Sequence, residues 1–337
     1  MIFAALCSAS ATERQAAAAA LTDLLEEKHS TEHHRRVGEL IASAEPNERA
    51  GGLAAIGSLI QLDGDDLGPR LSTYGPPLRT ALQRSVGSSL EVVGQVCEYY
   101  RELVRRARDP EALEAEARWS LGALSEDGDA SSLLSGDGGT GVSAEVRLLT
   151  GVLTLRQLTL QAPTAVYPHA AAALEQLWRP LTFHAPQVRA AAADALLALV
   201  VVVAPRATRY LTQWHTQLLA GARAALDRDS SASCHGGLLA LSCLLRVATV
   251  DFVFQEDSFE ASARLVGVGG GKAAGAAAPI ASCFSIAWAA ASRHLSNRKH
   301  PALMRTALQF VINLVHVAPD GRPVPVRLRA YARRDVT

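Results

Sequence analysis

The 337-residue chain has few aromatic side chains, few cysteines and no excess of charge. Aromatic residues make up 5% of the sequence, whereas alanine and leucine abound, so helices are favoured over sheets. Its five cysteines are scattered and form no CxxC pair, which argues against a disulfide framework and suits a reducing compartment. The 33 basic side chains balance the 33 acidic ones, so the overall charge gives no reason to expect nucleic acid or an anionic membrane as a partner.

Long hydrophobic runs are also missing from the sequence. A membrane-spanning helix needs roughly 18 apolar residues with few or no charges, but the longest candidate, residues 190–204, is shorter and contains Asp194. Apolar residues still make up 49% of the chain and charged residues 20%, which excludes a disordered chain. We therefore expect a folded protein without a membrane span, located in the cytoplasm or, alternatively, in a nuclear pool.

Signatures of enzymes are absent as well. The sequence contains no GxSxG motif and no HRD or DFG motif of a protein kinase. Residues 136–141 match the letters GxGxxG, but no predicted strand precedes them. Residues 267–273 resemble a phosphate-binding loop that is one residue too short and lacks the Ser or Thr that would hold magnesium. Both glycine-rich runs are interpreted as linkers.

Histidines and cysteines give no reactive pattern. His33 and His34 are adjacent and point about 100° apart on a helix, so they cannot share one metal and are expected on a solvated face. Cys234 and His235 are neighbours without an orienting acid, so a nucleophile–base pair is not expected. The arginines between 101 and 108 alternate with acids at helical ion-pair spacing, which favours a solvated face over a site for an acidic partner. We predict no catalytic residue, no cofactor and no metal ligand in this chain.

What the sequence does contain is a recurring apolar helix with a polar residue near its start. The polar residues are Arg49, Arg147, Arg189, His235 and Arg305, in helices expected over 48–60, 143–160, 186–203, 231–247 and 301–317. Another helix, the first of a pair, is expected over 165–178. Arg147 and Arg189 are 42 residues apart, and Arg189 and His235 are 46 apart, which is the spacing of HEAT and armadillo repeats. Because a single such helix cannot bury its apolar stripe, the pattern predicts an all-α fold, an α-solenoid of HEAT/armadillo-like helix pairs wound as a right-handed superhelix.

Composition divides this predicted array into segments. They are N-terminal HEAT repeats over 1–124, an acidic glycine-rich loop over 125–142, HEAT repeats over 143–254, a Gly/Ala-rich linker over 255–277, a HEAT-like helix pair over 278–319 and an arginine-rich tail over 320–337.

Three residues near the start of one helix are predicted to have structural roles. Asn47 follows Pro46 and is expected to be the N-cap of a helix over 48–60. Gly51 and Gly52 lie inside that helix, where glycine costs roughly 1 kcal/mol relative to alanine. Their presence predicts that a neighbouring helix approaches this face closely.

The run Asn47-Glu48-Arg49-Ala50-Gly51-Gly52 resembles the N-terminal repeat region of TOR (target of rapamycin) serine/threonine protein kinases. The resemblance continues through 11–17, 147–163, 186–189 and 235–241 to 300–319. It covers about residues 1–319, with breaks at the two predicted linkers, and the sequence after Pro319 departs from the family pattern.

The resemblance implies a scaffolding function in nutrient and growth signalling. In TOR kinases this helical region docks a Raptor-type subunit that presents substrates to the kinase. The rapamycin-binding and kinase domains of the family have no counterpart in this sequence, so no catalytic residue is carried over. Two alternatives stay open, a chain that itself phosphorylates proteins and a stand-alone HEAT/armadillo-repeat adaptor or transport-type protein unrelated to TOR.

Overall fold

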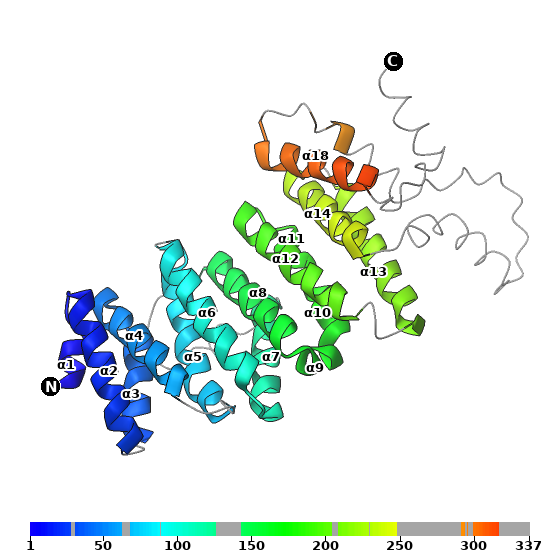
Figure 1. Cartoon of the computed structure of the whole chain (residues 1–337). Coiled ribbons are helices and arrows are strands. Elements are labelled where there is room, and N and C mark those ends of the chain that lie inside the picture. Colours follow the sequence, from blue (N-terminus) through cyan, green and yellow to red (C-terminus); the bar gives the residue numbers. More distant parts are fainter. Residues whose placement is uncertain are drawn as a thin grey trace, which may run out of the picture. The chain divides into compact units, whose positions relative to one another are not determined.

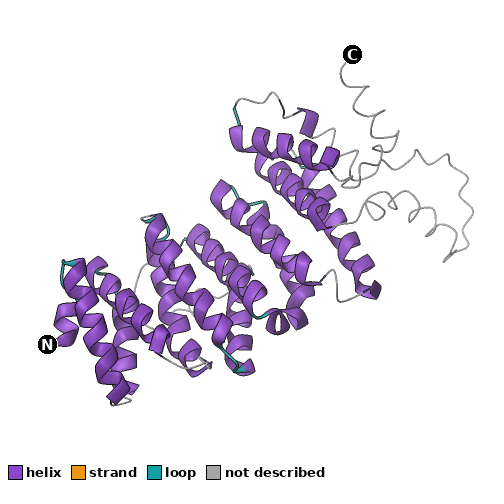
Figure 2. Ribbon diagram, in the orientation of Figure 1, coloured by secondary structure: helices purple, strands orange, loops and turns teal. Residues whose placement is uncertain are grey.

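The computed structural model describes residues 1–27, 31–62, 68–87, 89–125, 143–203, 208–228, 230–247, 291–293, 295 and 299–316. Throughout these residues the regular secondary structure is helical, which confirms the all-α fold (Figure 2). The predicted loop at 125–142, apart from Ser125, the linker at 255–277 and the tail at 320–337 lie outside the described residues. Contacts between α-carbons divide the chain into two compact units, Met1–Pro180 and Leu181–Thr337, with α11 (Trp178–Leu181) spanning the division.

The first unit is a double layer of helices. Its helices are α1 (Ile2–Leu6), α2 (Ala11–Glu27), α3 (Thr31–Ile41), α4 (Pro46–Leu62), α5 (Gly68–Ser85), α6 (Leu90–Arg106), α7 (Pro110–Leu124), α8 (Ala144–Gln161), α9 (Pro163–Val166), the 3₁₀ helix η1 (Tyr167–His169) and α10 (Ala170–Gln176). One layer runs α2, α4, α6 and α8, each packed on the next, and the other runs α3, α5, α7 and α9 (Figure 1). Helices adjacent in sequence, such as α5 and α6, also pack across the layers, so each pair buries its apolar faces against its neighbours.

Local sequence signals set several helix starts. Ser89 accepts a hydrogen bond from the Val92 amide at the start of α6, and Ser143 does the same for Val146 at the start of α8. Asp109 caps α7, whose first residue is Pro110, in the position where a proline loses no helical hydrogen bond.

α5 is a helix that the sequence pattern did not indicate, and it contains Pro76 and Pro77. Proline in a helix interior removes a backbone donor and normally breaks the helix. Here α5 packs on α3, α6 and α7, and a side chain at Gly38 of α3 would meet the Pro77 ring at 3.2 Å. Close tertiary packing therefore holds a helix whose own sequence disfavours it.

The second unit is described by four helices besides the end of α11. They are α12 (Pro186–Val203), α13 (Thr208–Leu226), α14 (Ser231–Val247) and α18 (Pro301–His316). α14 packs on α12, α13 and α18. Among the described helices, α12 is long and apolar enough to cross a membrane by length and composition, but 56% of it is buried inside the protein, as expected for a core helix.

Two local predictions were wrong. α4 begins at Pro46 and the Arg49 amide bonds to the Glu45 carbonyl, so Glu45 occupies the cap position and Asn47 lies exposed in the first turn. Proline at the first helical position fits because its missing amide has no helical partner there.

The single helix expected over 165–178 is instead divided into α9, η1 and α10, with a proline, Pro168, inside η1.

Candidate functional site

Metal-binding side chains do not gather in the described part of the chain, where no group of three His, Cys, Asp or Glu residues could hold an ion. His33 stacks on Phe3 with ring centroids 5.8 Å apart, whereas His34 is buried and its Nδ1 lies 2.6 Å from the Tyr74 hydroxyl. The two histidines thus face different neighbours, as predicted from their spacing. The expected solvated face was wrong for His34, which packs against α5.

Two of the described cysteine thiols, those of Cys97 and Cys234, are not set up as nucleophiles. Burial raises the pKa of Cys97 to about 11, with the positive charge of Arg156 opposing the shift. Burial also raises the pKa of Cys234, against the charge of Arg293. A thiol whose pKa lies above its ordinary value is a poor source of thiolate at neutral pH. Cys234 and His235 therefore do not form an activated pair.

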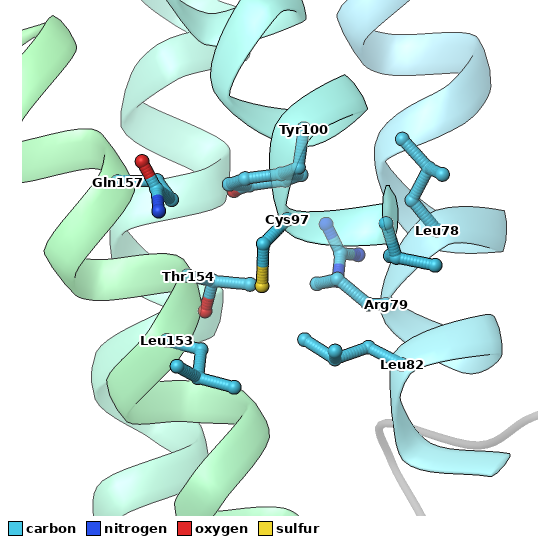
Figure 3. Close-up of a pocket in the computed structure, with 9 residues that line it drawn as sticks. Leu78, Arg79, Leu82, Cys97, Tyr100, Leu153, Thr154 and Gln157 are labelled. Carbon is cyan, nitrogen blue, oxygen red and sulfur yellow. The ribbon is translucent and has the colours of Figure 1, made fainter. Parts of the chain in front are cut away.

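A small cavity lies where α5, α6 and α8 meet (Figure 3). It measures about 10 Å³, and Cys97, Tyr100, Leu153 and Gln157 are among the residues that line it. A cavity needs roughly 10–15 Å³ to hold one water molecule, and a cofactor site is typically several hundred Å³. This cavity is therefore a packing space of about one water and not a substrate pocket.

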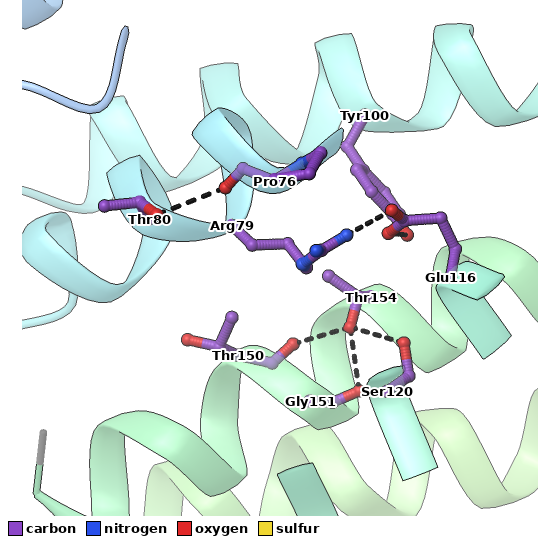
Figure 4. Close-up of polar contacts among 9 residues, drawn as sticks. All are labelled: Pro76, Arg79, Thr80, Tyr100, Glu116, Ser120, Thr150, Gly151 and Thr154. Atoms are coloured by element: carbon purple, nitrogen blue, oxygen red, sulfur yellow. Dashed lines mark hydrogen bonds and ion pairs between the residues drawn. The ribbon is translucent and has the colours of Figure 1, made fainter. Parts of the chain in front are cut away.

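Beside this cavity, a buried ion pair joins α5, α6 and α7 (Figure 4). Arg79 donates to Glu116, and the Tyr100 hydroxyl donates to the other carboxylate oxygen at 2.7 Å. The arginine side chain is 11% exposed and that of Glu116 is 7% exposed. Burial, followed by the charge of Glu116, raises the pKa of Tyr100 well above its ordinary value, so the phenol remains a donor.

The surroundings of this ion pair explain how it fits. The Arg79 guanidinium lies 4.3 Å from the centre of the Trp119 ring, and a β-carbon at Gly75 would lie 2.6 Å from a Glu116 oxygen. Gly75 thus leaves the space that the carboxylate occupies. The polar atoms of this ion pair bond to partners inside the protein, and the arrangement fixes α5, α6 and α7 against one another.

A hydroxyl pair links α7 to α8 nearby (Figure 4). Thr154 bonds to the carbonyls of Thr150 and Gly151, and its oxygen lies 2.9 Å from that of Ser120. Because the single Thr154 proton is directed to a carbonyl, Ser120 is the donor to Thr154. This contact also positions helices rather than reactive groups.

Arginines at the fourth position of three helices clamp the chain that precedes each helix. Nη1 of Arg14 in α2 bonds to the carbonyls of residues 8 and 9 at 2.7 and 2.9 Å. Nη1 of Arg49 in α4 bonds to those of residues 43 and 44 at 3.0 and 3.3 Å. Nη1 of Arg189 in α12 bonds to those of residues 183 and 184 at 2.6 and 2.7 Å. Of the five polar residues singled out in the sequence, Arg49 and Arg189 are thus structural clamps, and Arg14 is a further clamp that the repeat pattern did not include.

At α14 the repeated polar residue lies one position later in the helix than the clamp arginines do. The fourth residue is Cys234, and the histidine at the fifth position receives a hydrogen bond from the Arg189 side chain. The predicted 46-residue step from Arg189 to His235 thus joins unlike helical positions. It nevertheless identified two residues in direct contact.

A wide groove lies between α3 and α5. It has a volume of about 650 Å³, a floor that includes Gly38 and Pro77, and a rim carrying Glu32, Arg35 and Glu39. Arg35 bonds to both glutamates, and its hydrogen bond lowers the pKa of Glu32. A carboxylate held in its charged form this way is not suited to proton transfer at neutral pH, so the groove offers a surface rather than a reaction site.

The predicted solvated face of α6 is largely confirmed. Arg101 pairs with Glu98 and Arg105 with Glu102, and both arginine side chains are exposed. Arg106 differs, since its side chain is 17% exposed and donates to the Ile60 carbonyl of α4 at 2.5 Å.

Comparison with known proteins identifies relatives of one kind. The chain is 31% identical to the serine/threonine-protein kinase tor1 of Schizosaccharomyces pombe over 208 residues, which are 61% of this chain and 8% of that protein. It is 30% identical to the TOR kinase of Oryza sativa over 171 residues and 27% identical to that of Arabidopsis thaliana over 212 residues. No protein-family model matches the chain. The resemblance to TOR kinases is confirmed, and the matches span less than a tenth of the length of these relatives.

Proposed function

We propose that this chain is a helical-repeat scaffold of a TOR-type kinase assembly, located in the cytoplasm, and that it docks a Raptor-type subunit. The observation that carries the proposal is the similarity to three TOR kinases along a chain whose described residues build a helical repeat array. The buried polar networks around Glu116, Thr154 and His235 join helices to one another, so we assign the protein to binding rather than to chemistry.

Binding by such an array uses the outer ridges of its helices. In the first unit, Leu160 at the end of α8 is 46% exposed and Tyr167 in η1 is 36% exposed. Large apolar and aromatic side chains in exposed positions serve as anchors in protein interfaces. Both lie within 143–226, one of the two stretches that we propose as contact ridges, and the first repeats supply the other.

The experiment is co-purification of the full chain with the Raptor-type protein of the same organism, beside the full-length TOR kinase as positive control. We expect the chain to retain the partner, and the double variant Leu160→Arg/Tyr167→Ala to lose most of it. Leu308→Arg is the matched control, because Leu308 is 52% exposed on α18, outside both proposed contact ridges, and should leave binding unchanged.

If full-length TOR binds the partner and this chain does not, the scaffold proposal fails and an unrelated HEAT/armadillo adaptor becomes the better explanation. Loss of binding in Leu308→Arg as well would show that the ridge is wrongly placed. An ATP-turnover assay on the purified chain tests the enzyme alternative, and we expect no turnover.

A further inference from the structure

The last described helix, α18, is held to the rest of its unit by α14. Residues 248–300 connect the two helices, and α18 packs directly on α14. Two polar contacts lie at this junction. Ser231 and His300 approach to 3.3 Å at the exposed edge, and His235 and Thr306 to 2.7 Å further in.

His235 also contacts a third helix. Nε of Arg189 on α12 lies 2.7 Å from Nδ1 of His235, while Nε2 of the same ring lies 2.7 Å from the Thr306 hydroxyl. Arg189 is 7% exposed and His235 is 5% exposed, so water does not replace either contact easily. One imidazole thus links α12, α14 and α18.

The two hydrogen-bond partners of His235 determine which ring nitrogen carries the proton. An arginine nitrogen can only donate, so Nδ1 of His235 must accept and must carry no hydrogen. The neutral ring then has its proton on Nε2, which donates to the Thr306 oxygen. Adding a second proton at Nδ1 would place it against the Arg189 guanidinium and break the first hydrogen bond.

We propose that the hydrogen-bond chain from Arg189 through His235 to Thr306 is a proton-sensitive latch, which keeps α18 docked on α14 and releases it when His235 is protonated. The latch is a property of this fold and does not depend on the partner proposed above.

The pKa of His235 is shifted in the direction that a proton-sensitive latch requires. Burial, assisted by the charge of Arg189, lowers the pKa of His235 to about 4, compared with an unfolded value near 6.5. The released state therefore binds the proton more readily, so the latch is at full strength above pH 6.5 and weakens as the pH falls towards 4.

The described elements of this unit carry further titratable groups besides Arg189 and His235. They are Asp194 on α12, Arg223 and Asp227 on α13, Cys234 on α14, Arg293 in the helical residues 291–293, and His300 and Arg305 beside or on α18. Arg189 is the charged residue that hydrogen-bonds to the imidazole.

The first test removes one hydrogen bond without changing shape. Thr306→Val in the full chain should raise amide hydrogen exchange of residues 301–316 about tenfold at pH 7, whereas Thr306→Ser, which keeps the hydroxyl, should not. Exchange in α12 is the internal reference and should stay unchanged in both. Equal protection of α18 in the valine and serine variants would overturn the proposal.

The second test measures the protonation state of the His235 imidazole. Nitrogen NMR of the wild-type imidazole should show hydrogen on Nε2 at pH 7 and protonation only near pH 4, and protection of α18 should fall as the pH is lowered from 6.5 towards 4. His235→Gln can still accept from Arg189 and donate to Thr306, so its α18 protection should not follow that titration. A ring with its proton on Nδ1, or a His235 pKa near 6.5, would overturn the proposal even if the glutamine variant misfolds.

Discussion

The carbonyl oxygen of Leu6 lies against the α-carbon of Gly51, and a β-carbon built on that glycine would fall well under 3.0 Å from the oxygen. Its neighbour Gly52 faces α3, where a β-carbon would lie 2.5 Å from the Ile41 nitrogen. In the second unit, Gly236 of α14 lies against the Leu181 carbonyl in the same way. Two units thus use glycine for the same close approach of a helix start to the end of an earlier helix.

Gly51→Ala should therefore destabilise the protein, even though alanine is the better helix former. We expect a loss of about 1–3 kcal/mol in unfolding free energy, because the neighbouring atom is backbone and cannot turn aside. Gly52→Leu should cost more. Gly94→Ala in α6 is the matched control, since nothing lies within 4 Å of its β-position, and it should gain about 0.5–1 kcal/mol. Urea unfolding followed by circular dichroism measures all three, and a stabilised Gly51→Ala would contradict the close approach.

At the start of α4, the side chain that matters is Ser43 rather than Asn47. Its oxygen accepts from the Glu45 amide at 3.1 Å and lies 2.5 Å from a Glu48 carboxylate oxygen. Ser43→Ala should cost about 0.5–2 kcal/mol, in the range of a lost helix cap. Asn47→Ala should stay within about 0.5 kcal/mol, because the residue is an exposed one in the first turn. Thermal melting of the two variants side by side decides between them, and a larger effect at Asn47 would restore it as the cap.

The apolar helices and their recurrence could be predicted from the sequence because helix periodicity is a local property. The helices expected over 48–60, 143–160, 186–203 and 231–247 appear as α4, α8, α12 and α14 with ends within two residues. α5 could not be predicted, because Pro76 and Pro77 oppose a helix locally and only the packing of α3, α6 and α7 sustains it.

The buried polar contacts could not be predicted from the sequence for a different reason. Glu116 lies between apolar positions of α7, which hints at burial, but its partner Arg79 is 37 residues away in the sequence. No local pattern indicates that pairing. The arginine clamps were partly visible as a repeated polar position, while their carbonyl acceptors follow only from the turn between helices.

Removing a clamp should destabilise far more than removing a surface ion pair. Arg49→Met deletes charge-assisted hydrogen bonds to two carbonyls at the start of α4, and we expect a loss of about 1.5–3 kcal/mol. The matched control is Arg118→Met, whose side chain is 69% exposed and pairs with Glu114, and which should cost about 0–1 kcal/mol. Equal losses in urea unfolding would show that the clamp adds nothing beyond an ordinary surface contact.

The ion pair of Arg79 and Glu116 should be costly to break from one side. Glu116→Ala leaves a buried guanidinium without its counter-charge and a buried Tyr100 hydroxyl without its acceptor, so we expect a loss of about 3–5 kcal/mol. Tyr100→Phe removes one hydrogen bond to a charged group and should cost about 1.5–3 kcal/mol. If Glu116→Ala instead proves the milder of the two, the carboxylate is not the centre of the network.

Alkaline pH separates the role of Tyr100 from simple packing. Its pKa is raised in the folded protein, so between an ordinary phenol value near 10 and that higher pKa the unfolded chain loses the proton and the folded chain keeps it. Unfolding free energy should therefore fall as the pH rises above 10, because the unfolded state then binds fewer protons. Tyr100→Phe cannot ionise and should lose part of this alkaline sensitivity, although it is less stable at pH 7. Denaturant melts of both proteins at pH 7 and pH 10.5 measure the difference, and an identical decline would mean that Tyr100 titrates as an exposed phenol.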